Sequence, residues 1–346
     1  MKKKTGNDSA NMSNKEVGEV PLTKTKSPKF DYPKAEEKVC TLSDIPGVGP
    51  AVEEKLAAAG YTDLISIAVA PPTELSINSG VTEPAARKMI SFAKEKSLVE
   101  MESGTELEQR RTKIKKVSTG SKTFDELIGG GFESGAITEI FGEYGSGKSQ
   151  MAHILSVNVQ KDDPEAVAVF IDTEGTFRPD RIRQLARGAG LDEEKVLENI
   201  RIAKAFNSDH QMLLVEKVEK LISEGLNVKL IVVDSLTAHF RSEYMGRGTL
   251  APRQQKLNKH MHDLMKLADI RNVCVYVTNQ VMAKPDSFFG DPTVPIGGHI
   301  VGHNSLTRIY LRKGKKGSRV AKLVDSPNLP DGECNFFVES EGLKDV

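Results

Sequence analysis

Ile137-Thr138-Glu139-Ile140-Phe141 runs directly into Gly142-Glu143-Tyr144-Gly145-Ser146-Gly147-Lys148-Ser149. The first stretch is rich in apolar and β-branched side chains, which is typical of a buried strand. The second stretch is rich in glycine, and a helical pattern follows over residues 150–160. A strand, a glycine-rich turn and a helix in this order predict the opening unit of an α/β domain.

Three further apolar runs follow the same rhythm, at residues 166–171, 230–233 and 273–277. Each is short and rich in β-branched residues, and long helical stretches separate them. Runs that are apolar throughout are typical of parallel strands covered on both faces. The sequence therefore predicts an α/β fold with a mostly parallel central sheet over residues 116–346.

The glycine-rich stretch has the complete Walker A pattern. Its glycines let backbone N–H groups converge on phosphates, the lysine meets the β- and γ-phosphates, and the serine hydroxyl reaches Mg²⁺. We therefore predict a site for ATP and Mg²⁺, in which Lys148 is catalytic and Ser149 is a metal ligand. The residues predicted to contact the nucleotide are Gly142, Glu143, Tyr144, Gly145, Ser146, Gly147, Lys148, Ser149 and Gln150.

Polar side chains follow three of the apolar runs, where ligands bind in open α/β sheets. Asp234 is expected to hold Mg²⁺ through water. Glu174 is expected to orient and deprotonate the attacking water, and Gln280 to sense the γ-phosphate. The alternatives are a surface carboxylate at a strand end for Glu174 and a loop amide without a role for Gln280.

Two segments behind these strands are candidates for DNA binding. Residues 241–253 combine arginines with glycines in an expected loop, and arginine suits bidentate contact with phosphate. Residues 283–304 form a long glycine-rich stretch, which is either functional or disordered. An ordinary surface loop is the alternative for each. The predicted DNA-binding residues are Arg241, Arg247, Arg253, Lys284, Phe288, Phe289, Gly297 and Gly298.

Residues 37–99 have a helical pattern, with helices expected over 50–59, 64–69 and 82–96. Pro46-Gly47-Val48-Gly49 resembles the turn of a helix-hairpin-helix. Its glycines, Gly47 and Gly49, allow a tight turn whose backbone N–H groups bind a DNA phosphate. A turn in a protein-binding helical module is the alternative.

The remaining parts of the chain are polar. Residues 1–36 are lysine-rich and poor in apolar side chains, so we expect a disordered basic leader, which either touches DNA or only solubilises the chain. Residues 100–115 are charged and are interpreted as a linker.

Composition excludes several classes of function. The net charge is +0, so any DNA-binding surface must be local. Cys40, Cys274 and Cys334 form neither a disulfide framework nor a zinc pattern, and inert thiols in a reducing compartment are expected. The histidine pairs at 260/262 and 299/303 are not expected to bind metal. No apolar run is long enough to cross a bilayer, so we expect a cytoplasmic protein without a membrane partner.

Several stretches resemble the RecA-like recombinase family, and in particular its archaeal members. The resemblance covers about residues 40–346. It is carried by residues 118–122, 142–149, 171–181, 253–258, 278–281, 289–293 and 325–330.

The resemblance implies a RecA-like P-loop ATPase core preceded by a small all-α helix-hairpin-helix domain. It implies a DNA-dependent ATPase that polymerises on single-stranded DNA and exchanges strands with double-stranded DNA, with ATP between subunits. Arg181 and Gln184 would lie near the base, while Asp325 and Pro330 would cap the ATP of the neighbouring subunit. Further implied partners are other copies of the chain, in a filament or a ring, and recombination mediators. The expected location is the nucleoid.

The sequence departs from the family pattern in the linker. The family usually carries a Phe-x-x-Ala peg that docks into the next subunit, where this chain has Met101-Glu102-Ser103-Gly104. Met101 and Gly104 are therefore the expected polymerisation residues, with methionine still able to fill an apolar pocket. Ser149 stands where threonine is common, and the hydroxyl is retained.

Two other functions stay open. One is a non-catalytic paralogue or mediator that binds ATP and DNA without strand exchange. The other is a helicase or clock-type ATPase with a RecA core, against which the recombinase-like loops and the helix-hairpin-helix argue.

Overall fold

The computed structural model describes residues 41–61, 64–96, 103–283 and 293–346. The chain divides into two compact units, Met1–Met101 and Glu102–Val346. The expected leader, residues 1–36, lies outside the described residues.

The first unit is a small helical bundle. Leu56, Ile67 and Leu75 are fully buried in its core, together with one face of the last helix. A third helix, absent from the sequence prediction, begins at Pro72, because proline suits the first position of a helix and does not only break one. The elements are η1 (Leu42–Asp44), α1 (Pro50–Ala58), α2 (Leu64–Ala68), α3 (Pro72–Ser79) and α4 (Glu83–Lys96).

The second unit is built on one sheet of nine strands in the order β13-β12-β11-β10-β3-β7-β6-β4-β5. The pairs from β10 through β5 are all parallel, and the pairs from β10 to β13 are antiparallel. The predicted α/β fold with a mostly parallel central sheet is confirmed.

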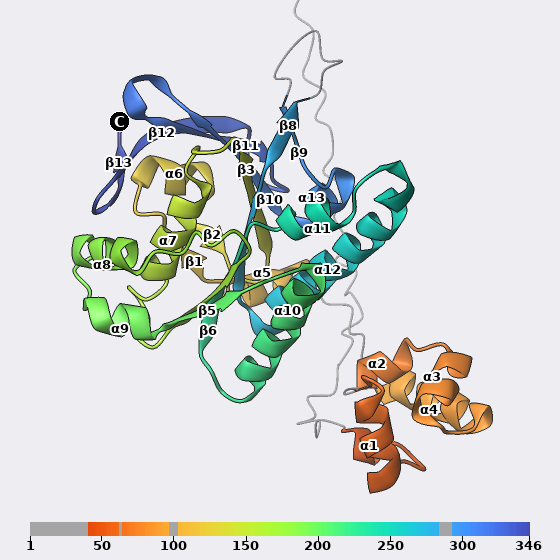
Figure 1. Ribbon diagram of the computed structural model, residues 1–346. Helices are drawn as coiled ribbons and strands as arrows, with labels where there is room; N and C mark the ends of the chain where they lie inside the picture. The colour runs from red at the N-terminus through yellow and green to blue at the C-terminus, as the bar shows by residue number, and fades with distance from the viewer. Residues whose placement is uncertain (1–40, 62–63, 97–102, 284–292) are drawn as a thin grey trace, which may run out of the picture. The chain divides into compact units, whose positions relative to one another are not determined.

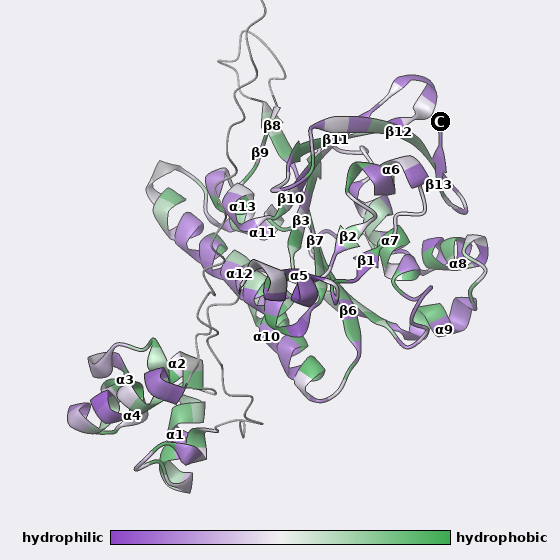
Figure 2. Ribbon diagram, turned by 180° about the vertical axis from the view of Figure 1, so that it is seen from behind, coloured by the Kyte–Doolittle hydropathy of each residue, from purple (hydrophilic) through white to green (hydrophobic). Residues whose placement is uncertain are grey.

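Helices cover both faces of this sheet (Figure 1). Side chains alternate along each strand: Ala168 and Phe170 pack with α6, α7 and α8, while Val169 packs with α10 and α12. The inner strands are consequently among the most hydrophobic segments of the chain (Figure 2). Burial on both faces explains why these strands are apolar throughout.

The four predicted strands run parallel, so their C-terminal ends lie at the same end of the sheet. They are β3 (Ile137–Gly142), β4 (Val167–Asp172), β6 (Val228–Asp234) and β7 (Cys274–Asn279). The remaining strands are β1 (Lys116–Val117), β2 (Phe132–Glu133), β5 (Ile200–Lys204), β8 (Val281–Ala283), β9 (Thr293–Pro295), β10 (Thr307–Lys313), β11 (Arg319–Asp325), β12 (Gly332–Glu339) and β13 (Gly342–Asp345).

The helices of this unit include one inside the expected linker, because Ser103 caps α5 and its hydroxyl accepts the N–H of Glu106. They are α5 (Gly104–Arg111), α6 (Lys122–Leu127), α7 (Lys148–Asn158), α8 (Pro179–Gly188), α9 (Glu193–Glu198), α10 (Ser208–Ser223), α11 (Ala238–Glu243), η2 (Arg247–Thr249), α12 (Leu250–Arg271), α13 (His299–Asn304) and η3 (Lys315–Gly317).

Candidate functional site: a nucleotide cleft

The glycine-rich turn joins the end of β3 to the N-terminus of α7. Gly145 and Gly147 adopt left-handed backbone angles, with φ of 75° and 113°. A side chain at Gly142 is impossible, because its Cβ would lie 2.1 Å from the carbonyl oxygen of Leu311. The turn therefore brings backbone N–H groups together at the start of a helix, which is a ready site for phosphate.

Lys148 lies folded over this turn. Its Nζ donates to the carbonyl oxygens of Gly142 and Glu143, at 2.8 and 2.9 Å. Burial lowers the pKa of Lys148, and the nearby carboxylates of Asp234 and Glu174 oppose that shift. A bound polyphosphate would add to the opposing charge, so the site favours an anion beside the ammonium group.

The carboxylate of Asp234 is held by two threonines. Its Oδ1 accepts from Thr278 Oγ1 at 2.5 Å, and its Oδ2 accepts from Thr176 Oγ1 at 2.8 Å. Asp234 is buried at the end of β6. Hydrogen bonds of this kind fix the orientation of a carboxylate, as a ligand of hydrated Mg²⁺ requires.

Glu174 follows β4 and faces the same space. Its Oε1 accepts from Gln280 Nε2 and from Ser235 Oγ, each at 2.8 Å. A carboxylate that follows one strand and an amide that follows another are therefore in direct contact. Asp172 shapes the turn that carries Glu174, since its carboxylate accepts backbone N–H groups from residues 174–177.

Sequence reasoning missed these supporting residues. Thr176, Ser235 and Thr278 stand directly beside the predicted carboxylates or one strand away. Hydroxyl residues next to strand-end carboxylates are a usable signal, since such carboxylates need donors to fix them.

His153 is a further residue that the sequence did not single out. Its Nδ1 lies 2.5 Å from the carbonyl oxygen of Ser149, and its Nε2 accepts the N–H of Arg178 at 3.2 Å. The ring packs between Phe170 and Phe177, and burial lowers its pKa. His153 thus connects the first turn of α7 to the segment that carries Glu174.

The other end of the cleft is organised by Arg181. Its guanidinium donates to Gln150 Oε1 at 2.8 Å and to Gln184 Oε1 at 3.2 Å. It also donates to the carbonyl oxygens of Glu339 and Ser340, each at 2.7 Å. The structure therefore brings together Gln150, Arg181 and Gln184.

Most of the predicted nucleotide-site residues line one cleft of about 1070 Å³, including Gln150 and Arg181, whereas Gln184 does not line it. The residues of the glycine-rich turn, Glu174, Asp234 and Gln280 line it together, apart from buried Ser146, whose Oγ has no partner among the described atoms. Asp325 and Pro330 are exposed and do not line the cleft of their own chain. Their expected contact with a neighbour's nucleotide stays a prediction.

The candidate DNA segment at 241–253 differs from the expected loop. Arg241 lies in α11, Arg247 in the short turn η2 and Arg253 in the first turn of α12, so most of the segment is helical. The expectation failed because its glycines are confined to the short stretch between α11 and α12, while its arginines have good helix propensity.

The second candidate segment is described at both ends. Gly297 and Gly298 have positive φ angles and lead into α13. Lys284, Phe288 and Phe289 lie outside the described residues, as does Met101.

The remaining predicted residues are placed as follows. Gly47 has a φ of 90° in the turn before α1, and Gly49 is the N-cap of that helix. Gly104 opens α5. These positions fit the predicted turn, and DNA binding and polymerisation stay predictions.

Two of the three cysteines are described by the structure, and Cys40 lies outside the described residues. Cys274 and Cys334 are buried and free, and burial raises the pKa of each to about 12. Within the described residues, no group of three or more His, Cys, Asp or Glu side chains is placed to hold a metal ion. None of the helices described here is long and apolar enough to cross a membrane.

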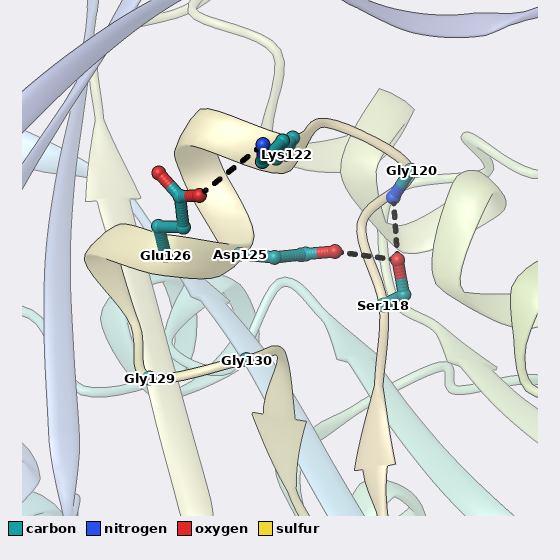
Figure 3. Close-up of a pocket in the computed structure, with 7 residues that line it drawn as sticks. All are labelled: Ser118, Gly120, Lys122, Asp125, Glu126, Gly129 and Gly130. Atoms are coloured by element: carbon teal, nitrogen blue, oxygen red, sulfur yellow. Dashed lines mark hydrogen bonds and ion pairs between the residues drawn. The ribbon is translucent and has the colours of Figure 1, made fainter.

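A smaller cavity of about 560 Å³ lies between the stretch 118–122 and α6 (Figure 3). Its central carboxylate, Asp125, accepts from the Ser118 hydroxyl and from the N–H and hydroxyl of Thr119. Lys122 and Glu126 pair with each other at 3.9 Å. These polar groups hold the start of α6 in place, so we assign the cavity a structural role.

The nucleotide cleft fits ATP and Mg²⁺ on its own chemistry. A helix N-terminus and a lysine meet at one end of the cleft, the turn there holds the unpartnered buried hydroxyl of Ser146, and the oriented carboxylate of Asp234 lines the same cleft as Ser149. The fold and the cleft together define a P-loop protein with a RecA-like core.

Comparison with known families agrees with this class and narrows it. The sequence model of the Rad51 family matches residues 110–346. A model described as a SAM-like helix-hairpin-helix tandem matches residues 41–95. The chain therefore belongs to the Rad51 family, whose members are RecA-like recombinases, bind DNA, use ATP with Mg²⁺ and are generally DNA-dependent ATPases.

Proposed function

We propose that this chain is an ATP-dependent DNA recombinase of the archaeal RadA type. In this proposal it binds single-stranded DNA, assembles into a filament and catalyses homologous pairing and strand exchange with double-stranded DNA. The observation that carries the proposal is the direct contact between Glu174 and Gln280. It joins a residue suited to activate water to Gln280, which lies three residues before the second candidate DNA segment begins at Ala283.

Hydrolysis follows from the positions of the cleft residues. The N–H groups of the glycine-rich turn and Lys148 bind the β- and γ-phosphates. Ser149 and Asp234 hold Mg²⁺, which when bound neutralises phosphate charge. Glu174 orients a water molecule and accepts its proton, while the oxygen attacks the γ-phosphorus and the bond to the β,γ-bridging oxygen breaks, releasing ADP and phosphate.

Gln280 couples ATP hydrolysis to DNA binding in this proposal. Its amide bonds either to Glu174 or to a γ-phosphate oxygen, and its backbone continues directly into β8. A change of partner at Gln280 therefore changes the root of the segment 283–304. The proposed DNA contacts are those predicted above, from both segments and from the turn at Gly47 and Gly49.

Assembly completes the site in this proposal. Asp325 and Pro330 lie outside the cleft of their own chain, which suits a role at the nucleotide of a neighbouring copy. Met101 and Gly104 are proposed as the polymerisation contact. Because the usual Phe-x-x-Ala peg is absent, we propose a contact that buries less area than the usual one.

A strand-exchange assay tests the proposal against the paralogue alternative. The protein is mixed with ATP, Mg²⁺, single-stranded DNA and a homologous duplex labelled with a fluorophore and a quencher on opposite strands. We expect fluorescence to rise with homologous duplex and to stay flat with a heterologous duplex. ATP and DNA binding without any homology-dependent rise would contradict the recombinase and favour the non-catalytic paralogue.

A further inference from the structure

Asn279 is a buried side chain that contacts three separate elements. It ends β7 and is fully buried. Its Nδ2 donates to Glu139 Oε1 at 2.7 Å and to the carbonyl oxygen of Ile296 at 2.6 Å. Its Oδ1 accepts from Thr237 Oγ1 at 2.7 Å. Both donor hydrogens and the carbonyl of this amide are therefore used.

Two of these partners are the roots of the two candidate DNA segments. Thr237 immediately precedes α11, which leads into residues 241–253. Ile296 follows β9, at the described end of the segment 283–304. The roots also lie close together, because a Cβ added at Gly297 would lie 3.6 Å from Thr237 Cγ2. Segments far apart in sequence thus share one small buried unit.

The third partner fixes this unit to the sheet. Glu139 is fully buried in β3, and its second oxygen accepts from Arg308 Nε at 2.7 Å. A buried carboxylate is costly unless it is paired and hydrogen-bonded, so Glu139 requires both Arg308 and Asn279. Asn279 cannot turn away without leaving this charge with one fewer donor.

The unit adjoins the γ-phosphate sensor. Gln280 follows Asn279 in the chain and bonds to Glu174, and its backbone carbonyl accepts the N–H of Ile296 at 3.0 Å. If Gln280 turns toward a nucleotide, the backbone at residues 279–280 shifts. All three partners of Asn279 then have to adjust together, because a tightly packed, hydrogen-bonded cluster cannot move one member without breaking its bonds to the others.

We infer that Asn279 is a positioning residue that joins the roots of both candidate DNA segments to the γ-phosphate sensor. Nucleotide binding then alters the segment 241–253 as well as the segment 283–304, although only the second is continuous with Gln280. By linkage, a ligand on the first segment changes nucleotide affinity by the same factor. The inference rests on the proposed function for the identity of that ligand, which is DNA.

Thr237 offers a clean way to test the inference without altering Asn279. Thr237→Val keeps the branched shape and removes the hydroxyl donor, whereas Thr237→Ser keeps the donor. Trypsin cleavage within residues 241–253 is measured with and without Mg²⁺ and a non-hydrolysable ATP analogue, in the absence of DNA. We expect the analogue to change the cleavage rate roughly two- to thirty-fold in wild type and Thr237→Ser, and less than about 1.5-fold in Thr237→Val.

A second readout separates coupling from stability. Turnover of ATP without DNA is expected to stay within about twofold of wild type in Thr237→Val, while its stimulation by DNA falls. If Thr237→Val folds poorly, Thr237→Ala replaces it, because the smaller side chain also lacks the hydroxyl donor and fits without a clash. The expected loss of response to the analogue is the same.

Two results would overturn the inference: the same response to the analogue in Thr237→Val as in wild type, or no response in wild type itself. Absence of strand exchange in wild type would instead reject the proposed function, and the DNA-free cleavage result would still decide the role of Asn279.

Discussion

The part of the nucleotide cleft that holds Glu174 and Asp234 is built in the opposite way from the helix-hairpin-helix turn. In the cleft, side chains hold one another: Glu174 bonds to Gln280 and Ser235, and Asp234 bonds to two threonines. In the turn before α1, a side chain at Gly47 or Gly49 would meet no atom within 4 Å, so the surface consists of open backbone. A site made of side chains fails when one is changed, whereas a site made of backbone N–H groups fails only when its conformation is lost.

The largest effect is expected from Lys148→Ala. It removes the cation that closes the cleft over phosphate, so nucleotide binding weakens and ATP turnover falls by about a thousandfold. Turnover and binding of a fluorescent ATP analogue measure this. Lys122→Ala is the matched control, because the Lys122 side chain is exposed and its ammonium group forms an ion pair with Glu126 on the same helix. Equal losses in both variants would mean that the cleft is not the site.

Glu174→Gln is expected to separate binding from chemistry. The amide keeps the shape and size of the side chain but cannot accept a proton, so turnover falls by about a thousandfold while ATP affinity is retained. Turnover and equilibrium binding are measured on the same preparation, with the exposed Glu126→Gln as control. Wild-type turnover in Glu174→Gln would dismiss Glu174 as the base.

Acid is expected to destabilise the second unit, residues 102–346, more than the first, helical unit. All seven histidines lie in the second unit, and burial lowers the pKa of His260 from 6.5 to about 4. Between these values the unfolded chain binds a proton that the folded chain refuses, so stability is lost as pH falls. By linkage, the free energy of unfolding drops by about 3 kcal/mol between pH 6.5 and pH 4 from this group.

Urea unfolding followed by circular dichroism at several pH values measures that loss. His260→Leu removes the titrating group, so its stability is expected to fall less steeply with acid than that of wild type. Parallel pH dependences in the two proteins would contradict the assignment.

The smallest effect is expected from Gly47→Ala. Gly47 has a φ of 90°, so alanine there is strained by about 1 kcal/mol and disturbs the turn that we propose binds DNA. We expect DNA affinity to fall only a few-fold, because several backbone and loop contacts share the binding. Gly60→Ala is the matched control, with a φ of 88° and equally open space at the other end of α1. Identical DNA affinities for the two variants across a salt series would contradict a role of this turn in DNA binding.

The sequence predicted the inner strands well and the outer ones poorly. β3, β4, β6 and β7 are buried on both faces, so their apolar runs are continuous and easy to recognise. The antiparallel strands β11 and β12 mix buried and exposed positions and contain charged residues such as Lys322 and Glu333. Their pattern carries little signal until the neighbouring strand is known.

In the candidate site, too, some residues could be predicted from the sequence and others could not. Lys148, Glu174, Asp234 and Gln280 stand in a motif or at the end of an apolar run, and each lines the cleft. Residues that act through others, such as Asn279, have no such marker, because their partners come from segments distant in the sequence. Such contacts depend on the packing of the whole sheet and are not encoded locally.

The most direct test of the central claim is the rate of ATP hydrolysis with and without single-stranded DNA at moderate salt. The account predicts slow turnover by the protein alone, a clear rise on adding single-stranded DNA, and no rise in Glu174→Gln. Turnover that is unaffected by DNA in the wild-type protein would contradict the claim that this cleft drives a DNA recombinase.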